Sequence, residues 1–173
     1  KPVAECLFAG IMLDTKNFSL KTGTRTFEAA SCLKKSGADN FEVKKMFSNS
    51  MDVYKLKCQI IEAAYDLNSC AISALKFDKI TDNVRLACAQ AADELLNIKN
   101  IEASFVIFSE NDRVNISARS LGKRNVQLIM EKLGGGGHRT MAATQIDNAS
   151  IEEVEKNLTL AINEKINELK GGK

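Results

Sequence analysis

The sequence has no tryptophan, one proline and one histidine among its 173 residues. With ten glycines and one proline it cannot be a collagen-like or low-complexity chain, and its 45% apolar content excludes a disordered one. It contains no run of 18 apolar residues, so we expect no membrane-spanning helix. Imidazole is the commonest metal ligand in proteins, and a single copy limits the metal chemistry of the chain alone. Because the chain starts with Lys1 and not with methionine, we expect a fragment of a longer polypeptide.

An excess of charge of one sign is also lacking. The 24 Lys and Arg residues nearly balance 22 Asp and Glu residues, which gives a net charge of +2. That small net charge argues against a protein that binds long nucleic acids, since such proteins usually carry a strongly basic face. The five cysteines are odd in number and lack C-x-x-C spacing, so their pattern indicates neither a zinc ribbon nor a disulfide framework. We therefore expect buried free thiols in a reducing cytoplasm.

The first third of the chain is typical of helices. N-capping residues predict a helix over 26–35 and a short helix from Asp39 to about Phe47. Apolar side chains at helical spacing predict a longer helix over 51–65. We expect four of the eight phenylalanines to lie in the core, namely Phe8, Phe27, Phe105 and Phe108.

From residue 66 onward short strands alternate with helices. Strands are expected over 70–77, 104–108, 114–119 and 142–146, and helices over 84–98, over 126–133 and from 151 onward. This order predicts an α/β (α+β) domain with a mixed sheet. We accordingly divide the chain into a helical part over 1–50, a connecting helix over 51–65, the α/β domain over 66–168 and a frayed tail over 169–173.

A glycine tetrad is the strongest local motif. Gly134, Gly135, Gly136 and Gly137 follow a predicted helix directly and lead into His138. Successive N–H groups in such a loop can form a concave nest for phosphate oxygens, and the imidazole can donate to the same anion. The alternative is a flexible turn that carries an exposed histidine.

The predicted strand that begins at Arg113 carries a row of polar side chains. Two-residue periodicity puts its apolar residues on the core face and Asn115, Ser117 and Arg119 on the other face. An amide, a hydroxyl and a guanidinium in a row suit a phosphate or the edge of a nucleobase. A half-exposed strand with a solvated polar face is the alternative.

Asp14 ends the first apolar stretch of the chain. A carboxylate at the carboxyl end of a buried element is a common position for a ligand site in α/β proteins. Asp14 is therefore a candidate metal ligand, although an ordinary helix cap or turn residue would give the same pattern.

Two blocks of the sequence resemble one known family. The first combines Leu7–Thr15 with Gly23–Ala30 and resembles the end of the DHH domain of cyclic-di-AMP phosphodiesterases of the GdpP type. The second resembles the DHH-associated C-terminal domain of the same enzymes, and it consists of Asn115–Gly122, Asn125–Leu133, the tetrad with His138, and Met141–Gln145. By this resemblance residues 1–50 are the helical tail of the DHH domain, and residues 66–168 are the substrate-binding domain.

The resemblance implies a hydrolase that converts cyclic-di-AMP to linear pApA. In that family two manganese ions, held by Asp and His residues of the DHH domain, activate a water that attacks phosphorus. Asp14 matches the last metal-binding aspartate of the family. Elements that bind the nucleotide are matched by Ser117, Arg119, Gly134–Gly137 and His138. In this scheme the glycine N–H groups and Arg119 hold the phosphate that is not cleaved.

The sequence departs from a complete enzyme of that family. It has no Asp-His-His motif and only one histidine, so we expect the chain alone to be inactive. The expected partners are cyclic-di-AMP or a short linear dinucleotide, the upstream DHH domain and, as a further candidate, a second copy of the chain. We expect the parent protein to be anchored in the cell membrane with this part in the cytoplasm. Two alternatives stay open: a fragment of an exonuclease or oligoribonuclease of the same superfamily, and a nucleotide- or RNA-binding module without catalysis.

Overall fold

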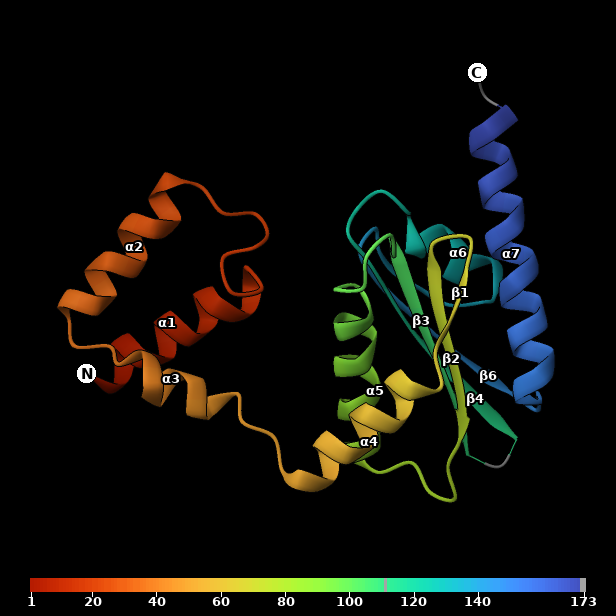
Figure 1. The fold of residues 1–173 in the computed structure, drawn as a ribbon, viewed down its shortest axis with the longest axis horizontal. Helices are drawn as coiled ribbons and strands as arrows, with labels where there is room; N and C mark the ends of the chain where they lie inside the picture. Colours follow the sequence, from red (N-terminus) through yellow and green to blue (C-terminus); the bar gives the residue numbers. More distant parts are fainter. Residues whose placement is uncertain (111, 172–173) are drawn as a thin grey trace. The chain divides into compact units, whose positions relative to one another are not determined.

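The computed structural model describes residues 1–110 and 112–171. The chain divides into two compact units, Lys1–Asn49 and Ser50–Lys173, and each is described by itself (Figure 1). Within the described residues, no helix combines the length and the apolar character that crossing a membrane requires.

The first unit consists of three helices, α1 (Pro2–Asp14), α2 (Thr24–Lys35) and α3 (Asn40–Met46). Asp39 caps α3 as predicted, because its carboxylate accepts from the N–H groups of Phe41 and Glu42 at 2.7 and 3.3 Å. Helix α2 begins two residues earlier than predicted, with Gly23 as its N-cap. A small apolar core joins the helices and consists of Ala4, Phe8, Ala30, Ala38 and Val43.

The second unit is an α/β domain, which confirms the predicted fold class. It begins with α4 (Met51–Glu62) and continues with β1 (Tyr65–Leu67), β2 (Cys70–Lys76), α5 (Asp82–Leu95), β3 (Ala103–Glu110) and β4 (Arg113–Ser120). It ends with α6 (Val126–Lys132), β5 (Gly136–His138), β6 (Met141–Asp147) and α7 (Ile151–Gly171). The six strands form one mixed sheet in the order β1-β2-β3-β4-β6-β5, in which only β2 and β3 are parallel.

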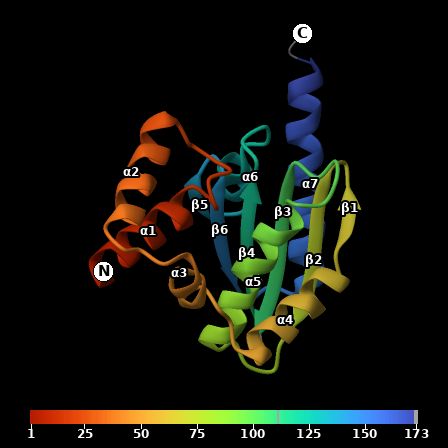
Figure 2. The same ribbon diagram turned by 60° about the vertical axis from the view of Figure 1, so that its left-hand side comes forward.

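Helices cover both faces of this sheet (Figure 1). Alternate residues of β3 point to opposite sides, so that Phe105 and Ile107 pack with α6 and α7 while Val106 and Phe108 pack with α4 and α5. Turning the molecule by 60° shows α5 in front of β3 and β4, with β6 and β5 beyond them (Figure 2). The sheet therefore has two apolar cores, one on each face.

Three expectations about elements and side chains need correction. The helix predicted over 51–65 ends at Glu62, because Tyr65 starts a hairpin whose two-residue turn, Asn68–Ser69, has positive φ angles. The frayed tail expected over 169–173 stays a prediction: α7 is helical up to Gly171, and residues 172–173 lie outside the described residues. Phe27 is 56% exposed and stacks on Phe18 instead of lying in the core. Three of the cysteines are exposed, and only Cys70 and Cys88 are buried thiols.

Candidate functional site

The polar row of β4 lies on the side of the sheet that faces α5. The predicted alternation is confirmed on the other face, where Val114, Ile116 and Ala118 are buried beneath α6 and α7. The polar face is not solvated, since Asn115 is 6% and Arg119 is 9% exposed. The row therefore lies in a largely enclosed environment, where an unmatched polar group is costly.

An open cleft of about 520 Å³ lies over this face of the sheet. The structure brings four of the predicted residues to it, Asn115 and Ser117 from β4 and Gly134 and Gly135 from the segment after α6. Among the described residues, the lining consists of Arg85, Phe108, Asn115, Ile116, Ser117, Gly134, Gly135, Ala143, Thr144 and Gln145. Both apolar and polar groups are thus available to a bound molecule, as in most small-molecule sites.

Asn115 is the residue in this lining whose hydrogen bonding is incomplete. Its amide nitrogen Nδ2 is buried and has no hydrogen-bond partner among the described residues. Most buried side-chain donors in folded proteins are paired, and an unpaired one costs about 1–3 kcal/mol. The lining therefore includes a buried donor without a protein acceptor, which a bound water or a ligand atom can supply.

The glycine tetrad is not an open loop. Gly134, with φ +77°, ends α6, whereas Gly136 and Gly137 belong to β5 and pair with Ala143 and Ala142 of β6. A Cβ on Gly135 would lie 2.3 Å from the Ala143 carbonyl oxygen. The absence of side chains therefore lets the backbone pass close to β6.

The predicted phosphate nest needs correction at its first two residues. The Gly134 N–H donates to the Glu131 carbonyl at 3.1 Å and the Gly135 N–H to the Met130 carbonyl at 2.8 Å. Both donors are used to end α6, a common fate of N–H groups after a helix. A ligand can approach this backbone closely, but these two N–H groups already have acceptors.

The remaining predicted residues are not among those that line the cleft. His138 is exposed on β5, opposite Met141. The Arg119 guanidinium lies inside the chain, where Nη1 donates to the Ala118 carbonyl at 3.0 Å. Its Nε is buried without a hydrogen-bond partner among the described residues and lies 3.5 Å from an Asp93 carboxylate oxygen on α5. Asp14 is the exposed last residue of α1 in the first unit.

No metal centre is assembled in the part of the chain that the structure describes. Over residues 1–110 and 112–171, no three His, Cys, Asp or Glu side chains come together as metal ligands. Two metal ions of the kind used by phosphodiesterases need several such ligands. The residues present therefore do not fit a two-metal site, and Asp14 is at most one ligand of it.

Sequence reasoning missed three polar residues of the lining, Arg85, Thr144 and Gln145. Gln145 follows Met141 and Ala143 at two-residue spacing on β6, and strand periodicity could have placed it opposite Asn115. Arg85 comes from α5, and its position depends on how that helix packs on the sheet. The sequence around Arg85 contains no pattern that predicts such a tertiary contact.

Comparison with known proteins adds to this geometry. Residues 70–168 match the DHHA1 domain family. The chain is 47% identical over 163 residues to the cyclic-di-AMP phosphodiesterase GdpP of Geobacillus thermodenitrificans, which covers 93% of this chain and 24% of that protein. It is 44% identical over 163 residues to GdpP of Bacillus subtilis, with 93% and 25% covered. The chain thus spans about a quarter of the length of these relatives.

A solved structure supports the fold. An exopolyphosphatase-related protein from Bacteroides fragilis superposes with a TM-score of 0.84 at 24% identity, over 96% of this chain and 51% of that one. At this identity the likeness shows a shared fold alone.

Proposed function

Because the chain belongs to the DHHA1 domain family, we propose that it is the substrate-binding part of a phosphodiesterase that hydrolyses cyclic-di-AMP to linear pApA. Two relatives that are 44–47% identical carry the name cyclic-di-AMP phosphodiesterase, which supports the substrate class. The observation that carries the proposal is the buried Asn115 amide without an acceptor, in the same cleft as the Ser117 hydroxyl.

A cyclic dinucleotide supplies what this cleft requires. Its phosphate oxygens and base nitrogens are acceptors for Asn115 Nδ2 and the Ser117 hydroxyl, and its bases can contact the ring of Phe108. The exposed Arg85 guanidinium at the rim suits a phosphate. We assign these residues to binding and orientation of the dinucleotide, so that the scissile phosphate is held for attack.

The other residues that match the family remain in the proposed site. His138 would donate to the ligand from the edge strand, next to Gly136 and Gly137. Arg119 would act through its charge, because its guanidinium is already held by Asp93 and the Ala118 carbonyl. Gly134 and Gly135 would contact the ligand through their backbone, which the ligand can approach closely because these residues have no side chain.

We propose manganese as the metal of the parent enzyme and Asp14 as one of its ligands. The described residues do not assemble a two-metal site, so the missing ligands would come from an upstream DHH domain. The chain alone is then inactive, and its proposed partners are that domain and a second copy of the chain. We further propose a membrane-anchored parent whose DHHA1 domain lies in the cytoplasm.

Isothermal titration calorimetry with cyclic-di-AMP tests the binding site on the intact chain. Ser117→Ala and Arg85→Ala should each weaken binding by about three- to tenfold, the effect of one lost hydrogen bond. Lys156→Ala is the control, because it removes an exposed cation of α7, which covers the opposite face of the sheet. The proposal fails if the control weakens binding as much as the site variants, or if only RNA oligomers bind.

A further inference from the structure

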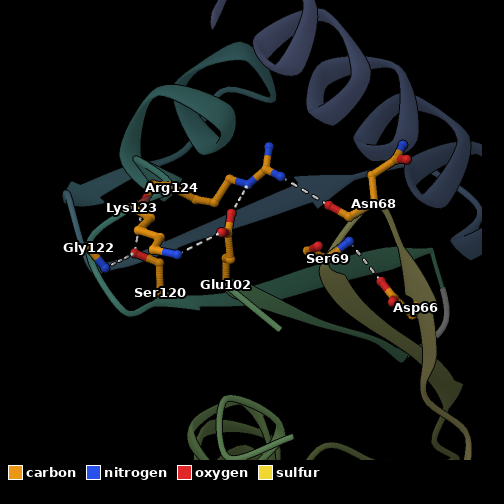
Figure 3. Close-up of polar contacts among 8 residues, drawn as sticks. All are labelled: Asp66, Asn68, Ser69, Glu102, Ser120, Gly122, Lys123 and Arg124. Carbon is orange, nitrogen blue, oxygen red and sulfur yellow. Dashed lines mark hydrogen bonds and ion pairs between the residues drawn. The ribbon is translucent and has the colours of Figure 1, made fainter. Parts of the chain in front are cut away.

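Glu102, directly before β3, connects two turns of the second unit (Figure 3). Its carboxylate accepts from Lys123 Nζ at 3.2 Å and from Arg124 Nε at 3.0 Å. Arg124 also donates through Nη2 to the Asn68 carbonyl at 3.0 Å, so its guanidinium lies between Glu102 and the β1–β2 turn. One carboxylate thus ties the loop after β4 to a hairpin more than fifty residues away in sequence.

The backbone of Glu102 strengthens this junction. Its N–H donates to the Ser69 carbonyl at 2.8 Å, and its carbonyl accepts from the Leu121 N–H at 3.2 Å. The Arg124 side chain is only 17% exposed and that of Glu102 30% exposed, so their ion pair is partly shielded from solvent. The hydrogen bond from Lys123 lowers the pKa of Glu102 most. The positive charges of Lys123 and Arg124 lower it further, so that it lies below its ordinary value.

The loop fixed by Glu102 in turn holds the β5–β6 turn. The Ser120 N–H donates to the Thr140 carbonyl at 3.0 Å, and the Val126 N–H donates to the Arg139 carbonyl at 3.1 Å. Arg139 returns a bond from Nε to the Gly122 carbonyl at 3.0 Å. With the bond from Ser120 Oγ to the Arg139 carbonyl at 3.3 Å, the two residues that directly follow His138 are attached to residues 120–126 by four hydrogen bonds.

We propose that Glu102 is a positioning residue for His138. Through Arg124 and residues 120–126 it fixes the turn at the end of β5, and thereby the place at which the imidazole meets a ligand. Only the consequence for ligand affinity rests on the proposed function, because the effect on the position of His138 exists without ligand.

The histidine is the only one in the chain, so its imidazole gives a single set of NMR signals. We compare the ligand-free wild-type chain with Glu102→Gln, which keeps the size of the side chain and removes its charge. The imidazole signals should shift. The amides of Ser120 and Val126, which donate to the turn after His138, should exchange with solvent about fivefold faster, because a partly exposed ion pair contributes up to about 1 kcal/mol. Arg124→Gln breaks the same bridge from the other side and should give the same pattern.

Asp147→Asn is the matched control. It removes the charge from the Asp147–Arg113 pair, 2.7 Å apart at the opposite end of β4 and β6, and should leave the His138 signals unchanged. The proposal is wrong if Glu102→Gln and Arg124→Gln both leave these signals at their wild-type positions, or if Asp147→Asn moves them as far. If His138 moves in the variants but the wild type does not bind cyclic-di-AMP, the positioning role stands and the proposed function fails.

Discussion

Alanine substitutions should distinguish the glycines of the tetrad. A Cβ on Gly135 would lie 2.3 Å from the Ala143 carbonyl oxygen and 2.5 Å from Thr144 Cβ. Ordinary contacts are more than 1 Å longer, and the first of these partners is backbone, so β6 must move. Overpacking of this kind costs about 1–3 kcal/mol of the free energy of unfolding.

Gly136 is the matched control one residue further on. A Cβ there meets no atom within 4 Å, and its φ is not positive. Gly136→Ala should therefore change the free energy of unfolding by less than about 0.5 kcal/mol. Gly137 combines a φ of +144° with a Cβ distance of 2.5 Å to Ala142 Cα, so Gly137→Ala should be the most destabilising of the three.

Urea unfolding monitored by far-UV circular dichroism measures this series. The expected order of stability is Gly136→Ala close to wild type, then Gly135→Ala, then Gly137→Ala. Equal losses at Gly135 and Gly136 would refute the reasoning, since they would show that the tetrad does not pack against β6 as described. An unchanged stability of Gly135→Ala would refute it as well.

Further predictions concern buried groups. Asn115→Leu replaces the unpaired amide by an apolar side chain, so calorimetry should show about tenfold weaker binding of cyclic-di-AMP, while urea unfolding shows equal or higher stability. Ellman's reagent should react quickly with the three exposed thiols in the native chain, and with all five only in denaturant. Burial raises the pKa of Cys70 to about 11 and that of Cys88 to about 12. Because the unfolded chain loses these protons first, near pH 9, stability should fall as the pH rises from about 9 to 12 in urea titrations.

Local sequence patterns were sufficient to predict most strands and helices of the second unit. The alternation of Val114, Ile116 and Ala118 identified the core face of β4, and the helix that ends at the tetrad was placed within a residue. The capping role of Asp39 was also correct, because it depends only on bonds to the next turn. Tyr65 was assigned to a helix because its spacing fits one, whereas the turn at Asn68–Ser69 pairs it with β2.

The candidate site could be predicted only in part, since its residues meet through the sheet. Periodicity placed Ser117 on the polar face, but the burial of Arg119 follows from its contact with Asp93 on α5. The tetrad was interpreted as a phosphate nest because its neighbours were unknown. The structure shows instead that two of its N–H groups end α6 and that two of its residues form an edge strand.

The central claim is that the cleft between β4, β6 and α5 binds a cyclic dinucleotide. Amide NMR spectra of the ¹⁵N-labelled chain, recorded during titration with cyclic-di-AMP, test it most directly because they also detect weak binding. We predict saturable shifts at the amides of Ser117, Gly134 and Gly135 and at the side-chain amide of Asn115, with no shift at Lys156 of α7, on the opposite face of the sheet. Saturable shifts confined to other surfaces, or none up to millimolar ligand, would contradict the account.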